Sequence, residues 1–315
     1  MLGFLAICLP IFAVVFIGLG AARARLVTPA NVDAVGLFAF NVALPAMLLR
    51  LMAAQPLAES FKPDYFLGYL GACLAVFFGV TLIAKARPHD RQRAAALGAA
   101  AAMGNVGYLA PPLLLPILGE RIAGPVAMAI VAEVAVIIAI GSVLMSRAAA
   151  CGARWRTSWI AVRGLARNPV ILSVAAGAML AATGSGIPPF LDRFLAFLGG
   201  AAGPTALFAL GGTLGRLAVR RDLVLVSAGV AFAKLVAYPV LVWAILDPVL
   251  GLERFWVMAG ILLAAMPTAT NAFVLAQRNG AGAEEVSAAV MLSTLLAAIL
   301  FPVTAWLISA PVVVP

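Results

Sequence analysis

The sequence predicts an all-α membrane protein with ten transmembrane helices arranged as two inverted repeats of five helices each. The first observation is composition: 64% of the 315 residues are hydrophobic and 10% are charged, which leaves more apolar surface than a soluble domain can cover. The second is that long apolar runs alternate with short connections rich in charge, Pro or Gly, as in polytopic helical proteins. The third is that the two halves share landmarks at a nearly constant spacing.

The internal repeat is read from Gly, Pro and Asp residues that keep their order relative to the apolar runs. A shift of about 159 residues aligns the first half with the second, and the shift grows to roughly 163 further along. Hydrophobic chains with such a repeat are typical of secondary transporters, in which one part rocks against another around a central site. The aligned pairs are Pro10 with Pro169, Gly18 with Gly177, Pro29 with Pro188, Asp33 with Asp192, Pro45 with Pro204, and Ala101-Ala102-Met103 with Ala264-Ala265-Met266.

Ten apolar stretches are long enough to span a bilayer as helices, which needs about 20 residues. The second begins well for a helix, because Thr28 can cap it, Pro29 suits its first turn and Asp33 faces the positive end of its dipole. We expect residues 1–150 to form the first repeat, 151–166 a basic linker and 167–315 the second repeat. The expected spans are 3–22, 30–54, 65–84, 93–118, 122–146, 167–183, 189–215, 223–246, 254–277 and 284–309.

The placement of charge predicts the orientation of the spans. Of the 21 Lys and Arg residues, 15 fall in the connections after spans 1, 3, 5, 7 and 9, and 5 fall on the opposite side. Connections rich in Lys and Arg face the cytoplasm. We therefore expect a multi-pass protein of the plasma (inner) membrane, with both termini outside and the basic connection between spans 5 and 6 in the cytoplasm. Because each repeat has an odd number of spans, the second copy must be inverted relative to the first.

The placement of charge and the small number and spacing of Cys and His residues exclude several classes of function. The net charge of +9 sits in connections that flank the membrane, which predicts orientation and lipid contact and no nucleic acid partner. Cys8, Cys73 and Cys151 show no paired spacing, and His89 is the only histidine. Neither a disulfide framework nor a metal site is therefore expected. Without an intramembrane histidine or paired carboxylates, we expect no catalytic residues, no enzyme and no cofactor.

Spans 4 and 9 are interrupted at matching positions by proline, which removes a backbone donor and obstructs the preceding turn. Gly104 and Gly107 add backbone freedom at the same place in span 4. Broken backbone at membrane depth is tolerated only beside a cavity or other protein, and matched breaks in two halves point to a transporter site. A simple packing kink is the alternative. The two stretches read Ala99-Ala-Ala-Ala-Met-Gly104-Asn105-Val-Gly107-Tyr108-Leu-Ala-Pro111-Pro112 and Ala264-Ala-Met-Pro267-Thr268-Ala-Thr270-Asn271.

Prolines also match between spans 2 and 7. They stand in Asn41-Val-Ala-Leu-Pro45 and in Gly200-Ala-Ala-Gly203-Pro204. The candidates for a bent scaffold or gate, against which the interrupted spans move, are therefore Asn41, Pro45 and Pro204. Plain packing kinks are an alternative that explains these residues equally well.

Two charged residues fall deep within the predicted spans, Glu133 in span 5 and Lys234 in span 8. A lone charge at the bilayer centre costs about 2.5–3.5 kcal/mol on insertion scales, so pairing or neutralisation is expected. Two hypotheses stay open. The residues form a fixed ion pair between helices of the two repeats, or Glu133 takes up and releases a proton during a transport cycle.

Taken in order, these motifs resemble the auxin efflux carrier family, which includes bacterial dicarboxylate carriers and plant auxin transporters. The interrupted stretch around Asn105 resembles the family's span 4, and the stretch around Asn271, continuing to Ser293-Thr294, resembles its spans 9 and 10. The motifs that resemble spans 6, 7 and 8 are Arg167-Asn168-Pro169, Ala206-Leu-Phe-Ala-Leu-Gly211-Gly212, and Lys234 followed by Tyr238-Pro239.

The resemblance implies a fold like that of sodium/bile-acid symporters, with an elevator mechanism. Spans 1, 2, 6 and 7 would form a scaffold, and spans 3–5 with 8–10 would form a mobile transport domain with spans 4 and 9 crossing at its centre. It also implies a carrier of a small organic anion, such as a carboxylate or an auxin-like acid. The implied substrate-binding residues are Gly104, Asn105, Gly107, Tyr108, Thr268, Thr270 and Asn271, with Pro111, Pro112 and Pro267 as candidates for holding the crossover open.

The main alternative is a sodium-coupled symporter of the bile-acid type, since hydroxyls such as those of Ser293 and Thr294 are able to ligate sodium. Proton and sodium coupling both stay open. The lipid bilayer accounts for the exposed apolar spans, and a homodimer would account for them as well. No arginine lies in the middle of span 4 or span 9, so a singly charged substrate is better supported than a doubly charged one.

Overall fold

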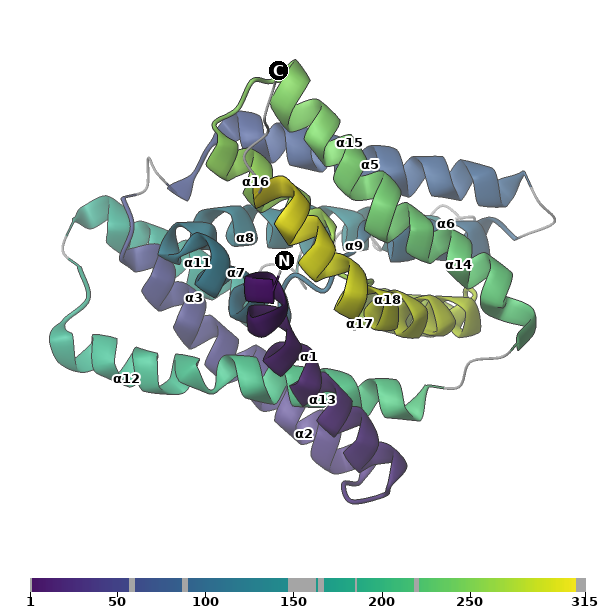
Figure 1. The fold of residues 1–315 in the computed structure, drawn as a ribbon, viewed down its shortest axis with the longest axis horizontal. Coiled ribbons are helices and arrows are strands. Elements are labelled where there is room, and N and C mark those ends of the chain that lie inside the picture. The colour runs from purple at the N-terminus through teal and green to yellow at the C-terminus, as the bar shows by residue number, and fades with distance from the viewer. Residues whose placement is uncertain are drawn as a thin grey trace.

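The computed structural model describes residues 2–56, 60–86, 90–146, 163, 167–184, 186–217 and 221–309, and its regular segments there are helices (Figure 1). His89 and the predicted linker 151–166, Arg163 excepted, lie outside these residues. Seven helices in the described part are long and apolar enough to cross a membrane, and Pro169–Thr183 and Arg254–Ala264 are shorter apolar helices. The seven are Gly3–Arg23, Pro29–Ala53, Pro63–Lys85, Glu120–Met145, Pro189–Arg216, Val224–Val249 and Ala283–Ser309.

Helices occupy each of the ten ranges predicted from hydropathy. In the first half they are α1 (Leu2–Arg23), α2 (Pro29–Phe38), the π-helical η1 (Ala39–Ala43), α3 (Leu44–Ala53), α5 (Pro63–Lys85), α6 (Arg91–Ala102), α7 (Ala110–Leu118), the short η2 (Glu120–Ile122), α8 (Ala123–Ile130), the π-helical η3 (Val131–Ile137) and α9 (Ile138–Met145). In the second half they are α11 (Pro169–Thr183), α12 (Pro189–Gly200), α13 (Ala202–Arg216), η5 (Arg221–Leu223), α14 (Val224–Phe232), the π-helical η6 (Ala233–Ala237), α15 (Tyr238–Ala244), the π-helical η7 (Ile245–Val249), α16 (Arg254–Ala264), α17 (Thr270–Asn279) and α18 (Ala283–Ser309).

Local sequence explains where several helices begin. The Thr28 hydroxyl accepts a hydrogen bond from the backbone N–H of Asn31 at 3.2 Å, and Pro29 opens α2 as predicted. The Asn168 side chain accepts from the N–H of Val170 at 3.0 Å ahead of Pro169 in α11. These caps satisfy N–H groups that have no partner inside the helix.

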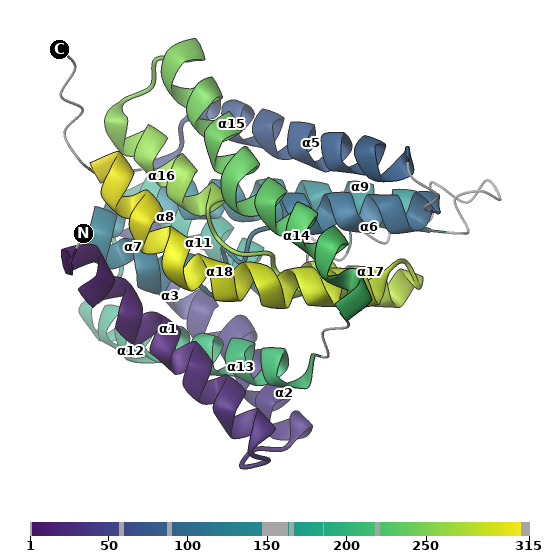
Figure 2. The ribbon, with the colours of Figure 1, turned by 45° about the vertical axis from the view of Figure 1, so that its right-hand side comes forward.

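The helices pack in two groups. In one group α1 lies along α13, α3 lies along α11 and α12, and α2 lies against α13; in the other, α5 packs on α6, α15 on α16, and α14 and α17 on α18. Figure 1 and Figure 2 place α1, α2, α12 and α13 on one side of the molecule and α5, α14 and α15 on the other. Each group therefore contains helices from both halves of the chain.

Helices α1 and α13 approach each other closely because glycines face the contact. A Cβ atom added at Gly211 would lie 1.9 Å from the Val15 carbonyl oxygen, and one at Gly18 would lie 2.2 Å from the carbonyl oxygen of Phe208. Small residues allow helix backbones in a membrane to come this close.

We expect Gly211→Ala to lower the free energy of unfolding by about 1–3 kcal/mol or more, because the added methyl group must force the two backbones apart. Thermal unfolding of the purified protein in detergent measures the effect. Gly20→Ala is the matched control on α1, since no atom lies within 4 Å of a Cβ built there and alanine favours a helix over glycine. Equal stability of the two variants would show that α1 and α13 are not in close contact.

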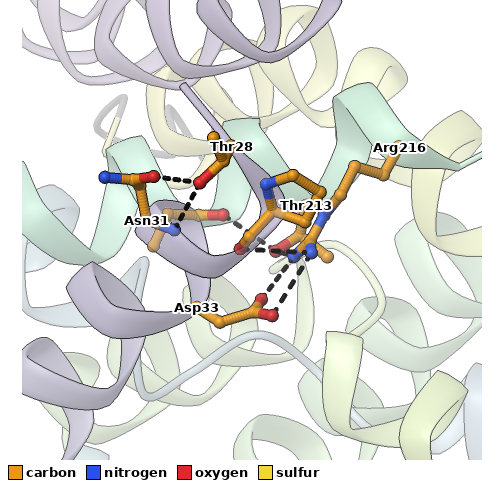
Figure 3. Close-up of polar contacts among 7 residues, drawn as sticks. Thr28, Asn31, Asp33, Thr213 and Arg216 are labelled. Atoms are coloured by element: carbon orange, nitrogen blue, oxygen red, sulfur yellow. Dashed lines mark hydrogen bonds and ion pairs between the residues drawn. The ribbon is translucent and has the colours of Figure 1, made fainter. Parts of the chain in front are cut away.

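Two ion pairs join the helices of the predicted spans 2 and 7. Arg216 Nη2 lies 2.6 Å from Asp33 Oδ1 (Figure 3), and Arg50 Nε lies 2.7 Å from Asp192 Oδ1. In each pair the aspartate stands near the start of one helical stretch and the arginine near the end of the other. Asp33 and Asp192 are also aligned residues of the internal repeat. The two stretches therefore run antiparallel and are joined at both ends.

Candidate functional site

The two interrupted stretches meet at the centre of the structure and pair with each other. Helix α6 ends at Ala102 and α7 begins at Ala110, while α16 ends at Ala264 and α17 begins at Thr270. Between these ends, Gly104 and Thr268 form an antiparallel β-bridge. The Asn105 N–H donates to the Pro267 carbonyl at 2.8 Å, and the Ala269 N–H donates to the Met103 carbonyl at 2.9 Å. This pairing, which we call the crossing, satisfies backbone groups that the breaks set free.

The prolines of the breaks take different positions. Pro111 and Pro112 stand in the first turn of α7, where a missing N–H costs nothing. Pro116 lies inside α7, and Pro267 lies in the crossing itself, where its carbonyl accepts from Asn105. The second half-helix of each pair, α7 and α17, begins without a side-chain cap. Because Pro111 and Pro112 have no N–H, α7 has few amides to offer, and the N–H groups free to bind an anion are mainly those at the start of α17.

Two buried polar atoms at the crossing have no hydrogen-bond partner in the described structure, Asn105 Nδ2 and Thr268 Oγ1. Asn105 is 3% exposed and Thr268 is fully buried. Buried polar groups are nearly always hydrogen-bonded, so each exception calls for an explanation such as a ligand. Thr268 is the bridge partner of Gly104, and Asn105 is the next residue along the chain, so the two atoms come from opposite halves of the sequence.

A small cavity of about 20 Å³, the crossing pocket, adjoins Asn105. It has room for about one water molecule. A Cβ atom built at Gly107 would meet no atom within 4 Å, so the backbone there is accessible. The pocket is lined by Phe40, Gly104, Asn105, Gly107, Tyr108, Ile130, Val134, Asn168, Val170, Ala269 and Asn271.

A much larger cavity of about 760 Å³, the vestibule, lies next to the crossing pocket. The two share Phe40, Tyr108 and Asn271. The rings of Phe40 and Tyr108 are 6.0 Å apart between centroids, so two aromatic side chains stand where the cavities adjoin. The vestibule is lined by Val32, Asp33, Gly36, Leu37, Phe40, Tyr108, Ala209, Leu210, Thr213, Arg216, Leu217, Thr270, Asn271, Phe273, Val274, Gln277 and Arg278.

The predicted gate residues lie apart from both cavities. Asn41 and Pro204 are exposed, and neither they nor Pro45 line a cavity. Pro45 follows the π-helical segment η1, which brings the neighbouring Phe40 to the cavities. Next to Pro204, a Cβ at Gly203 would lie 3.4 Å from Pro112 Cβ, so α13 contacts the start of α7.

Glu133 and Lys234 are both fully buried beside the crossing, each within a π-helical segment. The Glu133 carboxylate accepts hydrogen bonds from the Gly104 N–H at 2.6 Å, the Tyr69 hydroxyl at 2.6 Å and the Tyr238 hydroxyl at 3.4 Å. π-Helical turns are frequent at functional sites. The carboxylate therefore holds the backbone of the crossing directly.

Lys234 approaches the crossing from the other break. Its Nζ donates to the Ala264 carbonyl at the end of α16 at 2.7 Å and lies 4.4 Å from the centroid of the Tyr238 ring. A Cβ built at Gly104 would lie 2.9 Å from Lys234 Nζ and 3.1 Å from Glu133 Oε2. Among the described ion pairs none joins Glu133 to Lys234 directly. The two charges instead lie on either side of the space that a Gly104 side chain would fill, which leaves glycine as the residue that fits there.

The hydroxyls considered as sodium ligands are engaged with backbone groups. Ser293 Oγ accepts from the Thr268 N–H at 3.0 Å and donates to the Val290 carbonyl at 3.2 Å. Thr294 Oγ1 donates to the same carbonyl at 2.7 Å. Ser293 therefore supports the crossing from α18.

Comparison with known proteins identifies the family. The family model described as "Membrane transport protein", which covers the auxin efflux carriers, matches residues 4–306. The chain belongs to this family. The transporter is also 36% identical over 300 residues to the "Putative malonate transporter" of Rhizobium meliloti (strain 1021), a match that covers 91% of this chain and 90% of the relative. The resemblance predicted from the motifs is confirmed, and the protein is a transporter and not an enzyme.

Sequence reasoning missed several residues of the transporter's site. Phe40, Tyr69 and Tyr238 were not expected to line the cavities or contact Glu133, because an aromatic residue in an apolar span carries no signal of what it faces. Asn168 lines the crossing pocket. Its motif, Arg167-Asn168-Pro169, contributed only to the family resemblance. The amide directly before Pro169 is the signal that could have marked Asn168 as a site residue.

Proposed function

We propose that the protein is a secondary transporter that moves a small organic anion by an elevator-type movement, with the substrate bound at the crossing. The observation that carries the proposal is that Asn105 Nδ2, buried and without a partner, lines the crossing pocket beside the uncapped start of α17. Thr268 Oγ1, on the other side of the β-bridge, also lacks a partner. Amide and hydroxyl donors together with free helix N–H groups suit a carboxylate. Gly104, Gly107, Tyr108, Thr270 and Asn271 complete this site in the proposal.

The substrate class that we propose is a short carboxylate, with malonate as the first candidate, because the relative described above is named as a putative malonate transporter. This reverses the preference for a singly charged substrate that the sequence motifs suggested. The crossing pocket of about 20 Å³ is too small for this anion. Binding therefore requires the Phe40 and Tyr108 rings to separate, which would join the pocket to the vestibule.

The proposed architecture is ten spans in two inverted repeats. The matched breaks and the two ion pairs at opposite ends of spans 2 and 7 support it. The group containing α1, α2, α3, α11, α12 and α13 would be the scaffold, and the remaining helices would be the moving part. The vestibule lies between α2 and α13 on one side and α17 on the other, which is where a sliding interface would open and close.

The proposed orientation makes the vestibule open to the cytoplasm. Its arginines, Arg216 and Arg278, stand at the ends of α13 and α17, next to connections on the Lys- and Arg-rich side. The described conformation would then be the inward-open one, with both termini outside.

We propose a structural role for Glu133 and Lys234, since each is hydrogen-bonded to backbone of the crossing. We propose no role for sodium, because the Ser293 oxygen already accepts from the Thr268 N–H, and neither Ser293 nor Thr294 lines the vestibule or the crossing pocket.

Uptake of radiolabelled malonate into liposomes containing the purified protein tests the proposal. We expect uptake above that of protein-free liposomes, competition by unlabelled malonate, and equal rates in sodium and choline buffers. Propionate, with the same carbon count and a single charge, is the comparison substrate. No uptake of either acid would contradict the proposed substrate class, and uptake only in sodium would favour the symporter.

A further inference from the structure

The vestibule carries one charge that is not compensated. Its charged lining residues are Asp33, Arg216 and Arg278. Asp33 and Arg216 neutralise each other through a two-fold contact, with Nη2 donating to Oδ1 at 2.6 Å and Nη1 to Oδ2 at 3.4 Å (Figure 3). Arg278 is exposed and has no ion pair among the described residues. The cavity therefore has a net positive charge, and it resides on Arg278.

Arg278 stands on the same helix face as the proposed substrate ligands. Asn271, Val274 and Arg278 all line the vestibule along α17, as expected for residues three to four positions apart on a helix. Seven residues separate Asn271 from Arg278, a rise of about 10 Å along the helix axis. Helical side chains tilt toward the N-terminus of their helix. Arg278 therefore lines the same cavity as Asn271, about 10 Å further along the helix axis.

We propose that Arg278 is the specificity-determining residue that favours doubly charged over singly charged substrates. The inference rests on the proposed function and states in addition which substrate charge the transporter prefers. One carboxylate is satisfied at the crossing by amide, hydroxyl and half-helix N–H donors. The second negative charge of a dicarboxylate needs a cation. The middles of spans 4 and 9 contain no arginine, and the Asp33–Arg216 pair has no net charge to offer.

The expected size of the effect follows from Coulomb's law. At a separation of about 10 Å and an effective dielectric constant near 20, one additional charge changes affinity by roughly tenfold. Because Arg278 is exposed, screening by salt over about one Debye length reduces this toward about threefold. Arg278 also belongs to the helix group that is proposed to move, so it would travel with the substrate while Arg216 stays with the scaffold.

The test compares malonate and propionate transport by wild type, Arg278→Gln, Arg278→Lys and Arg23→Gln in liposomes. Arg23 ends α1 on the same side of the membrane and does not line the vestibule, so Arg23→Gln removes an equal charge elsewhere. We expect Arg278→Gln to lower the ratio of malonate to propionate kcat/KM by about three- to tenfold, with Arg278→Lys and Arg23→Gln close to wild type.

An unchanged ratio in Arg278→Gln, or an equal loss for both acids, would overturn the inference while leaving the proposed function in place. Failure of wild type to transport either acid would overturn both. Thermal unfolding of each variant checks that it is folded. Arg278→Lys keeps the positive charge but changes the shape of the side chain, so it separates the effect of charge from that of shape.

Discussion

Asn105→Ala is expected to weaken malonate binding by about ten- to a hundredfold, because one hydrogen bond to a charged group is worth about 1.5–3 kcal/mol. The same substitution should leave the stability of the ligand-free protein unchanged or slightly raised. Asn105 Nδ2 has no partner to lose, and both backbone hydrogen bonds of the residue, to Pro267 and from Leu109, remain in alanine. Malonate-dependent thermal stabilisation and liposome uptake measure the two effects separately.

Asn279→Ala is the matched control for this substitution. Its Nδ2 donates to the Leu275 carbonyl at 2.9 Å, at the far end of α17 from the crossing. It should lose a little stability and keep malonate binding. If Asn105→Ala instead unfolds the protein while binding persists in the folded fraction, Asn105 is a structural residue and the substrate binds elsewhere.

Glu133→Gln is expected to be the most destabilising of these substitutions, by about 3–5 kcal/mol, which is the usual cost of leaving a buried charge without its counterpart. Three donors converge on the carboxylate, from Gly104, Tyr69 and Tyr238. An amide has one acceptor oxygen in place of two, so part of this set loses its partner, and the buried Lys234 loses its neighbouring anion. Thermal unfolding in detergent measures the loss.

The double variant Glu133→Gln with Lys234→Met distinguishes the two hypotheses for this pair. Removing both charges should recover most of the stability, because replacing a buried pair by neutral groups is often close to neutral. Under the structural hypothesis the recovered protein transports malonate with the pH dependence of wild type. Wild-type stability together with a lost pH dependence would instead identify Glu133 as the proton-carrying group.

The features that could be predicted from sequence are those with local signals. Hydropathy located the ten ranges in which the long helices lie, and prolines and glycines located both breaks, because each acts on its own stretch of backbone. Asn105 and Thr268 were expected at the breaks for the same reason. Their lack of partners is a new observation that depends on the three-dimensional packing.

The features that could not be predicted depend on contacts between distant segments. The β-bridge between Gly104 and Thr268 joins stretches from opposite halves of the chain. Phe40, which lines both cavities, lies in the π-helical η1, and no sequence pattern distinguishes η3, which holds Glu133, from an ordinary helix. Prolines are local signs of some of these segments: Pro45 and Pro239 follow η1 and η6, and Pro248 lies inside η7.

The packing of α1 along α13 and of α3 along α11 bears on how such a chain would arise. Each half buries much of its apolar surface against the other half, so a gene for one half would encode a subunit that needs a second copy inserted in the opposite direction. Joining two such genes turns a concentration-dependent association into a folding step within one polypeptide. In the proposed arrangement the joined copies are free to diverge, and Arg278 of α17 is one such difference, since α7 contains no charged residue.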